Sequence, residues 1–148
     1  MNPARQERGK APLRVYLSHS TDDTVFARKL RNLLVRRLNW RTFTSEELSA
    51  GEHWQSRMRS ELSESDLILA LLTPRLVESN WVLHELGAAW ALEKPIVAVI
   101  TRRDVLNALP APVHLAQTIE LQDLENEESI EQFLKNLQGI LTVASVRN

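Results

Sequence analysis

The chain has 148 residues, 43% of them hydrophobic, which suits a single domain with its own buried core. It contains no cysteine, which excludes disulfide bonds, thiolate zinc sites and a cysteine nucleophile, and the cytosol is the default compartment. With 18 basic and 19 acidic residues the net charge is −1, so no global field favours nucleic acid or an anionic membrane. Residues 1–10 lack the apolar core of a signal peptide, and no apolar run approaches the length of a membrane span.

The segment that follows a polar leader, residues 1–12, predicts the first strand and the first helix. Residues 13–17 are expected to form the strand, and Ser20 with Asp23 three residues later matches a pattern that begins many helices. The arginines of this helix predict a solvated face, with a nucleic-acid surface as the less favoured alternative. The apolar residues at helical spacing are Phe26, Leu30, Leu33, Leu34 and Leu38.

A long polar segment, residues 44–52, separates the predicted second strand, residues 40–43, from the second helix. It is longer than a plain connection needs. Ser49 with Glu52 repeats the capping pattern. The side chains expected on one face of the following helix are Trp54, Met58 and Leu62.

Two uninterrupted apolar runs predict the centre of a parallel sheet. Residues 67–72 and 96–100 do not alternate with polar residues, as expected for strands covered on both faces. A short turn is expected at Thr73-Pro74, and residues 117–121 predict a weaker edge strand. The closing helix places on one face Ile130, Phe133, Leu134, Leu137 and Leu141.

The alternation of strand and helix predicts a flavodoxin-like α/β domain over residues 13–143, followed by a tail over 144–148. We expect a five-strand parallel sheet in the order 2-1-3-4-5, with helices on both faces. In such sheets ligands bind beyond the carboxyl ends of the strands, where the strand order reverses. The loops expected there are residues 18–21 and 73–81, with 44–51 beside them.

The helix predicted from Ser79 to Trp90 brings an aromatic ring and a carboxylate together. Ser79 can cap the first turn, and Trp81 and Glu85 lie four apart on one face. This pairing near a helix start favours a site for a ring-bearing substrate beside a negative charge. Taken alone, Trp81 is more often a core or interface aromatic, and Glu85 is expected to be an exposed surface charge. Trp90 is better explained by packing.

Several other chemistries are disfavoured by the motifs. The four glycines form neither GxGxxG nor GxxxxGK, which argues against a Rossmann hydride site and a P-loop. A receiver domain needs an aspartate after the third strand, where this chain has Leu72-Thr73. Ser18, His19 and Asp22 are not expected to form a triad, since no GxSxG elbow is present and adjacent side chains at a strand end diverge. The four histidines lack metal-ligand spacing, so no metal site is predicted.

Three motifs occur in order along the chain. They are residues 13–20, the loop 43–54 with Leu48-Ser49-Ala50-Gly51, and Ser79-x-Trp81-x-x-x-Glu85-Leu86-Gly87-x-Ala89 followed by Lys94-Pro95-Ile96-Val97. Together they resemble, over residues 13–141, a Toll/interleukin-1 receptor (TIR) domain of the bacterial, NAD-cleaving type. The resemblance implies a flavodoxin-like fold, and cleavage of NAD+ as a substrate rather than its use as a cofactor. It also implies a role in bacterial defence, including antiviral defence, or in signalling.

The resemblance also implies site roles. Glu85 is the expected catalytic carboxylate, which would steady an oxocarbenium-like charge or hold the ribose hydroxyls. The other expected substrate-binding residues are Trp81, His19 and Trp54 as walls for the rings, Ser20 and Thr44 together with backbone N–H groups near phosphate or ribose, and Ser18. For Trp54 alone, packing and a site role are equally favoured. Many family members have an aspartate after the second strand, where this chain has Thr44-Ser45, which weakens the case for substrate contacts by the loop.

The loop after the second strand is expected to govern self-association with other TIR domains. Leu48 has no obvious core position and is the candidate anchor, and the remaining loop residues assigned to assembly are Glu47, Ser49 and Gly51. A sensor or oligomerising module is a further expected partner, whereas direct binding of nucleic acid or membrane is not. The competing hypothesis is a scaffold that binds other TIR domains without turnover. The pairing of Trp81 with Glu85 favours the enzyme.

Overall fold

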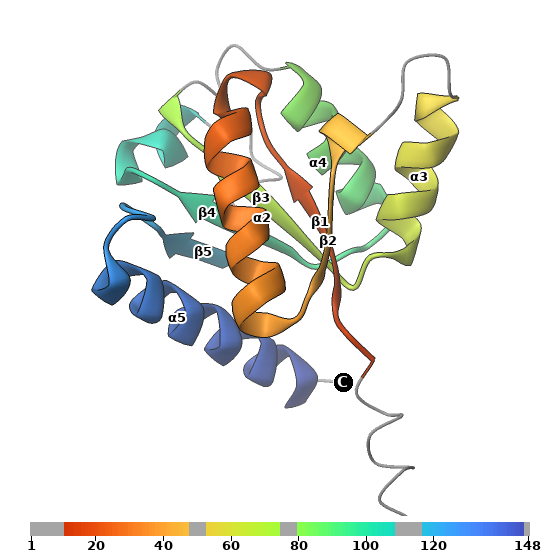
Figure 1. Cartoon of the computed structure of the whole chain (residues 1–148). Coiled ribbons are helices and arrows are strands. Elements are labelled where there is room, and N and C mark those ends of the chain that lie inside the picture. The colour runs from red at the N-terminus through yellow and green to blue at the C-terminus, as the bar shows by residue number, and fades with distance from the viewer. Residues whose placement is uncertain (1–10, 48–52, 75–79, 109–116, 147–148) are drawn as a thin grey trace, which may run out of the picture.

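The computed structural model describes residues 11–47, 53–74, 80–108 and 117–146. They form a five-stranded, fully parallel sheet in the order β2-β1-β3-β4-β5 (Figure 1), so the predicted fold class and strand order are confirmed. The strands are β1 (Arg14–Ser18), β2 (Arg41–Thr44), β3 (Leu67–Leu72), β4 (Ile96–Ile100) and β5 (Gln117–Glu120). The helices are α2 (Thr24–Leu38), α3 (Trp54–Glu64), α4 (Asn80–Ala91) and α5 (Glu127–Val146), with the 3-10 turns η1 (Thr21–Asp23), η2 (Ser45–Glu47) and η4 (Arg103–Ala108).

The helices form one layer on each face of the sheet. α2 and α5 lie together on one face, and their apolar residues pack with Val15, Leu17 and the alternate residues of the other strands. α3 and α4 cover the opposite face, where Tyr16 packs in the second core cluster. All six residues of β3 are buried, as the uninterrupted apolar run predicts for a central strand. Alternation along a strand therefore decides which helical layer each side chain faces.

The predicted start of the first helix needs a correction. Ser20 caps the 3-10 turn η1 instead of α2, because its hydroxyl accepts from the Asp22 backbone N–H at 3.3 Å. The α-helix begins at Thr24, and the Asp23 carboxylate accepts instead from the Thr73 hydroxyl at 2.6 Å. This long-range bond joins the loop after β1 to the loop after β3 at the carboxyl edge of the sheet.

The remaining differences from the sequence prediction lie at element ends. β1 and β2 each begin and end one residue later than predicted, and α5 runs to Val146, beyond the predicted domain end at 143. The predicted caps at Ser49 and Ser79, and most of the turn after Pro74, fall outside the described residues. In the part of the chain that the structure covers, no helix is long and apolar enough to cross a membrane.

Candidate functional site

Glu85 lies on the buried face of α4, and this corrects the expectation of an exposed charge. Its side chain is 0% exposed. The reason is visible in the helix register: the buried positions of α4 are Val82, Glu85, Leu86 and Ala89, which follow the i, i+3, i+4, i+7 spacing of a core-facing stripe. The carboxylate therefore occupies a core position in an otherwise apolar stripe.

Two hydroxyl groups from β1 bind the two oxygens of this carboxylate. Tyr16 donates its phenolic hydrogen to Glu85 Oε2, and the Ser18 hydroxyl donates to Oε1 at 3.0 Å. Tyr16 and Ser18 are two residues apart, so strand alternation points both side chains toward the layer of α3 and α4. The Trp81 side chain, one helical turn before Glu85, is a third hydrogen-bond partner. The carboxylate is thus held beside the carboxyl end of β1.

Burial controls the ionisation of the pair. Removal from water raises the pKa of Glu85 from its ordinary value of 4.5 to about 7, although the hydrogen bonds from Tyr16, Ser18 and Trp81 act in the opposite direction. Burial, followed by the nearby charge of Glu85, raises the pKa of the Tyr16 hydroxyl well above its usual range. Tyr16 therefore remains a donor, and Glu85 changes its charge near neutral pH.

A group of aromatic rings lies next to Glu85. The ring centroids of Trp54, at the start of α3, and Trp81 are 5.2 Å apart at an interplanar angle of 53°, and His84 lies 6.3 Å from Trp81. Trp81 is half-buried and Trp54 is 39% exposed. Because Trp81 contacts both Glu85 and Trp54, the two indoles form a partly exposed aromatic surface next to the carboxylate.

The other residues predicted for substrate binding lie at the same edge of the sheet but not all on the same face. His19 and Ser20 are buried just after β1, with His19 Nδ1 2.8 Å from the Ser20 carbonyl oxygen and His19 Nε2 without a hydrogen-bond partner among the described residues. Thr44 is paired with Leu17, so its side chain faces the layer of α2 and α5, away from Glu85. The structure therefore joins Ser18, Glu85, Trp81 and Trp54 into one cluster and separates Thr44 from it.

The described part of the predicted assembly loop is its first turn. The Thr44 backbone N–H donates to Glu47 Oε2 at 2.7 Å, and Arg31 on α2 lies 3.8 Å from the same oxygen. Arg28 on α2 binds Glu46 at 3.1 Å. Leu48, Ser49 and Gly51 fall outside the described residues. The turn that leads into this segment is therefore tied to α2 by ion pairs.

Tyr16 is the site residue that the sequence interpretation missed. A tyrosine within a predicted strand usually indicates an aromatic residue of the core, so Tyr16 was not singled out. The available signal was the apolar spacing of α4, which places Glu85 on a buried face where a carboxylate requires a donor.

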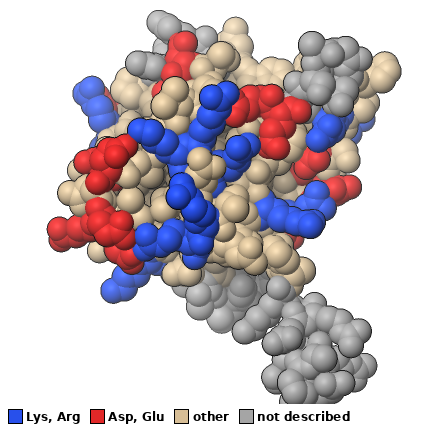
Figure 2. Space-filling view, viewed as in Figure 1, with Lys and Arg blue, Asp and Glu red and all other residues tan. Residues whose placement is uncertain are grey.

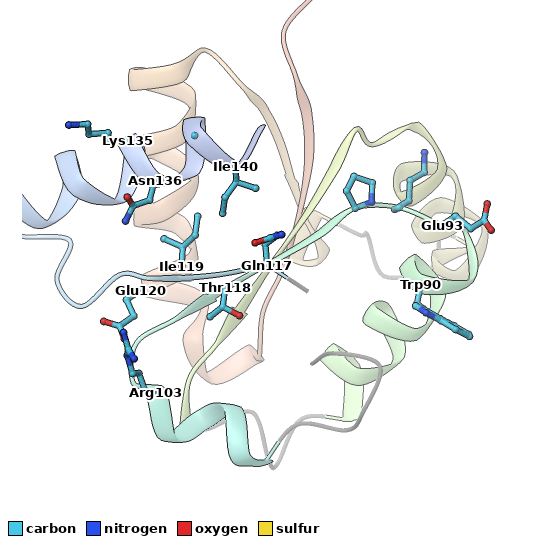
Figure 3. Close-up of a pocket in the computed structure, with 13 residues that line it drawn as sticks. Trp90, Glu93, Arg103, Gln117, Thr118, Ile119, Glu120, Lys135, Asn136 and Ile140 are labelled. Atoms are coloured by element: carbon cyan, nitrogen blue, oxygen red, sulfur yellow. The ribbon is translucent and has the colours of Figure 1, made fainter. Parts of the chain in front are cut away.

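A separate cavity lies away from Glu85. It has a volume of about 1150 Å³ and follows the edge strand β5, with Trp90, Pro95, Arg103, Gln117 and Lys135 among its lining residues (Figure 3). Neither Glu85 nor another residue of the predicted substrate site lines it. Across the described residues, no group of three or more His, Cys, Asp or Glu side chains is placed to hold a metal ion.

The fold and site define a class: a flavodoxin-like α/β domain with a buried carboxylate at the carboxyl edge of its parallel sheet. A family profile described as TIR domain matches residues 15–137, and the chain therefore belongs to the TIR domain family. Comparison with curated proteins gave no match.

Three solved structures illustrate the similarity. The TIR domain of the Toll-related receptor TRR-2 from Hydra magnipapillata superposes with a TM-score of 0.67 at 14% identity, covering 92% of this chain and 99% of that chain. The TIR domains of the activated Roq1 resistosome, which directly recognises the pathogen effector XopQ, superpose with a TM-score of 0.64 at 21% identity. The match covers 83% of this chain and 98% of that chain. The CMP N-glycosidase BcmB of Clostridium botulinum superposes with a TM-score of 0.55 at 14% identity, and the match covers 80% of this chain and 95% of that chain. At these identities the similarity concerns the fold.

Proposed function

We propose that this TIR domain, of the bacterial NAD-cleaving type, is an NAD+ glycohydrolase that breaks the bond between nicotinamide and ribose. The products are nicotinamide and either ADP-ribose or a cyclic isomer of it. The observation that carries the proposal is the Glu85 carboxylate, which is buried, bound by two hydroxyls and flanked by Trp81 and Trp54. A buried carboxylate whose pKa is raised toward neutrality is typical of a functional site.

The chemistry needs one carboxylate. Nicotinamide leaves NAD+ as a neutral molecule when the C1′–N bond breaks, so no general acid has to protonate it. The positive charge that develops on the ribose is stabilised by the ionised Glu85 carboxylate. A water oxygen then bonds to C1′ and releases one proton, or a group of the same nucleotide attacks C1′ and closes a ring.

Substrate contacts are proposed from the placement of the donors and rings. A carboxylate has about four lone-pair sites, so the three protein partners of Glu85 leave acceptor capacity for a ribose hydroxyl. Trp54 and Trp81 would bind the rings of the dinucleotide, and His19 and Ser20 would contact its ribose or phosphate. BcmB, an N-glycosidase by its name, has the same type of fold, which makes cleavage of an N-glycosidic bond compatible with this architecture.

The proposed setting is the cytoplasm of a bacterium, where NAD+ cleavage would serve defence or signalling. Self-association with other TIR domains would activate the enzyme, under the control of a sensor or oligomerising module. Neither a cofactor nor a metal is required by the proposed reaction, since NAD+ is the substrate.

The direct test is incubation of the concentrated, purified protein with NAD+, followed by chromatography of released nicotinamide. Glu85→Gln keeps the size of the side chain but removes its charge and replaces one acceptor oxygen with an amide NH2 donor. We expect the variant to lose at least about 100-fold in kcat, the scale seen when one electrostatic contact to a transition state is removed. Equal nicotinamide release by both proteins would sink the assignment of Glu85.

A second candidate function is a non-catalytic scaffold for TIR–TIR association. The observation that favours it is the complete burial of Glu85, whose oxygens are bound by donors of the protein itself. Under this alternative Glu85 is a structural carboxylate. Absence of nicotinamide release from a protein that light scattering shows to be self-associated would favour the scaffold.

A further inference from the structure

Building on the proposed NAD+ cleavage, we propose that Tyr16 is a positioning residue, whose buried hydroxyl fixes the Glu85 carboxylate in its reactive orientation and favours its charged form. The hydroxyl is the donor to Glu85 Oε2. Tyr16 is also the only tyrosine in the sequence, which makes its role experimentally accessible.

The Tyr16 side chain is itself held in place. It is 0% exposed and lies in β1 between its partners in β2 and β3, Phe43 and Ile68. The Phe43 ring packs against it with centroids 5.4 Å apart at 46°. A tyrosine ring has two side-chain torsions, so a fixed strand and a packed ring leave its hydroxyl little freedom. The donor is therefore presented at a fixed point.

Two such donors determine the orientation of the carboxylate plane. The torsion that turns a glutamate carboxylate is broad and is poorly fixed by the side chain alone. Here Tyr16 binds one oxygen and Ser18 binds the other, from the same face of the same strand. Rotation of the carboxylate would break at least one of these bonds. Catalytic groups need placement within about 0.5 Å, and the two hydrogen bonds from Tyr16 and Ser18 hold the Glu85 carboxylate with that precision.

The Tyr16 hydroxyl also favours the ionised carboxylate. Of the side chains that hydrogen-bond Glu85, each lowers its pKa against the dominant effect of burial. The neighbouring elements carry further charged or titratable groups, namely Arg57 and Glu61 on α3 and His84 on α4. Glu61 contributes to raising the pKa of Tyr16, which keeps the phenol protonated. The balance at Glu85 is between burial and the donors Tyr16, Ser18 and Trp81.

The test compares the pH dependence of kcat/KM in the wild type and Tyr16→Phe. The variant keeps the buried ring and removes the donor. Loss of a hydrogen bond to a charged carboxylate should raise its pKa by roughly 1 to 2 units. The acidic limb of the profile, which follows the ionisation of Glu85, should therefore move to higher pH by about one unit or more. We expect a loss of at least about tenfold in kcat at pH 6.5, partial recovery at pH 8.5 and little change in the KM for NAD+. A uniform loss at every pH would overturn the proposal.

Phe26→Leu is the matched control, because it shortens a partly buried aromatic side chain in the other helical layer and leaves Tyr16 and its packing unchanged. Its acidic limb should stay where the wild type has it. Ser18→Ala gives a second test if Tyr16→Phe folds poorly. It removes the donor to the other oxygen and should shift the limb in the same direction.

A readout that does not require turnover separates this inference from the proposed function. The carboxyl carbon of Glu85 can be followed by NMR between pH 4.5 and 9, with Glu85→Gln identifying its signal. Its midpoint should rise in Tyr16→Phe and stay unchanged in Phe26→Leu. An unchanged midpoint in Tyr16→Phe overturns the role of Tyr16. A raised midpoint in a protein that releases no nicotinamide supports the link between hydroxyl and carboxylate and overturns the proposed enzyme.

Discussion

At the scale of single residues, Glu85 places a negative charge in a position that folding alone would fill with an apolar side chain. Its neighbours on the same helix face are Val82, Leu86 and Ala89. Ionisation at such a position is unfavourable, and its hydrogen bonds compensate for only part of the cost. The fold therefore tolerates this charge rather than depending on it.

The first prediction is that Glu85 makes the protein less stable as the pH rises toward neutrality. Its pKa in the folded state, about 7, exceeds the ordinary value of 4.5, so the folded state binds the proton more tightly. The stabilisation is complete below about pH 4.5 and is lost as the pH rises through 7. At about 1.4 kcal/mol for each pKa unit, the unfolding free energy of Glu85→Gln relative to the wild type should increase by up to about 3 kcal/mol from pH 4.5 to 8.

Urea denaturation at several pH values measures this difference. Glu64→Gln, which changes an exposed carboxylate on α3, is the control and should follow the wild type. A constant difference between Glu85→Gln and the wild type across the pH range would contradict the prediction.

The second prediction concerns the outer aromatic ring of the site. Trp54→Ala should raise the KM for NAD+ about tenfold with a smaller change in kcat, since stacking of a base on an aromatic side chain is worth roughly 1 to 3 kcal/mol. Trp90→Ala is a matched control, because Trp90 is 60% exposed at the far end of α4 and Trp54 is 39% exposed. Steady-state kinetics with NAD+ decide the point, and equal effects of the two substitutions would argue against Trp54 in the site.

The sequence predicts which residues gather at the site better than it predicts their surroundings. Trp81 and Glu85 were singled out from their spacing, and the Trp81 side chain lies close enough to Glu85 to lower the pKa of its carboxyl group. The burial of Glu85 was not predicted, because carboxylates are rarely buried, although Val82, Leu86 and Ala89 form an apolar stripe that includes position 85. The separation of Thr44 from Glu85 was not predicted either, because Thr44 belongs to β2, where it pairs with Leu17 and strand alternation turns its side chain toward the other helical layer.

At the scale of elements, the apolar runs determine where the strands lie in the sequence, and pairing with the neighbouring strand determines the residue at which each strand begins and ends. The strands β3 and β4 have the predicted bounds, because their β-branched and leucine-rich runs end abruptly at polar residues. β1 and β2 both begin one residue late, where Arg14 pairs with Arg41. No local pattern in either segment indicates that pairing, so the sequence could locate these strands only to within a residue.

The charged and apolar contacts of α5 differ in their contribution to stability. Across the surface, Lys29 and Arg37 of α2 meet Glu125, Glu127 and Glu131, and Figure 2 shows basic and acidic side chains interleaved on this face. These pairs are exposed, and exposed pairs contribute little. Beneath them, α5 buries Ile130, Phe133, Leu134 and Leu137. The arginines of α2 thus form a solvated, paired face.

The third prediction is that α5 is held by its apolar face. Phe133→Ala should lower the unfolding free energy by about 3 to 5 kcal/mol, the range for removing a buried phenylalanine ring, because Phe133 is buried in the core. Arg37→Ala should leave the urea midpoint unchanged within error, and so should an increase of salt from 0.05 to 0.5 M. A large loss of stability in Arg37→Ala would show that the ion pairs position the helix.

At the scale of the whole molecule, the two candidate functions make different demands on the site. An enzyme needs Glu85 to meet the substrate, whereas a scaffold needs only the surface of the domain. The turn η2 is relevant to both functions. It follows β2 beside the site, and an ion pair between Glu46 and Arg28 joins it to α2. In the sequence, η2 is followed directly by Leu48, an apolar residue in a polar segment.

The last prediction is that NAD+ turnover per molecule rises with protein concentration. If a neighbouring subunit contacts the segment 44–51, association increases the fraction of molecules competent for catalysis and leaves the chemistry at Glu85 unchanged. Leu48→Asp should flatten the rise while the protein stays folded. The matched control is Val35→Asp, which places the same charge on an exposed apolar position of α2 and should retain the rise. Turnover is measured across a dilution series with light scattering in parallel. Constant turnover by a strict monomer would exclude activation by assembly, yet it would leave the role of Glu85 intact, because that role depends on contacts made within one chain.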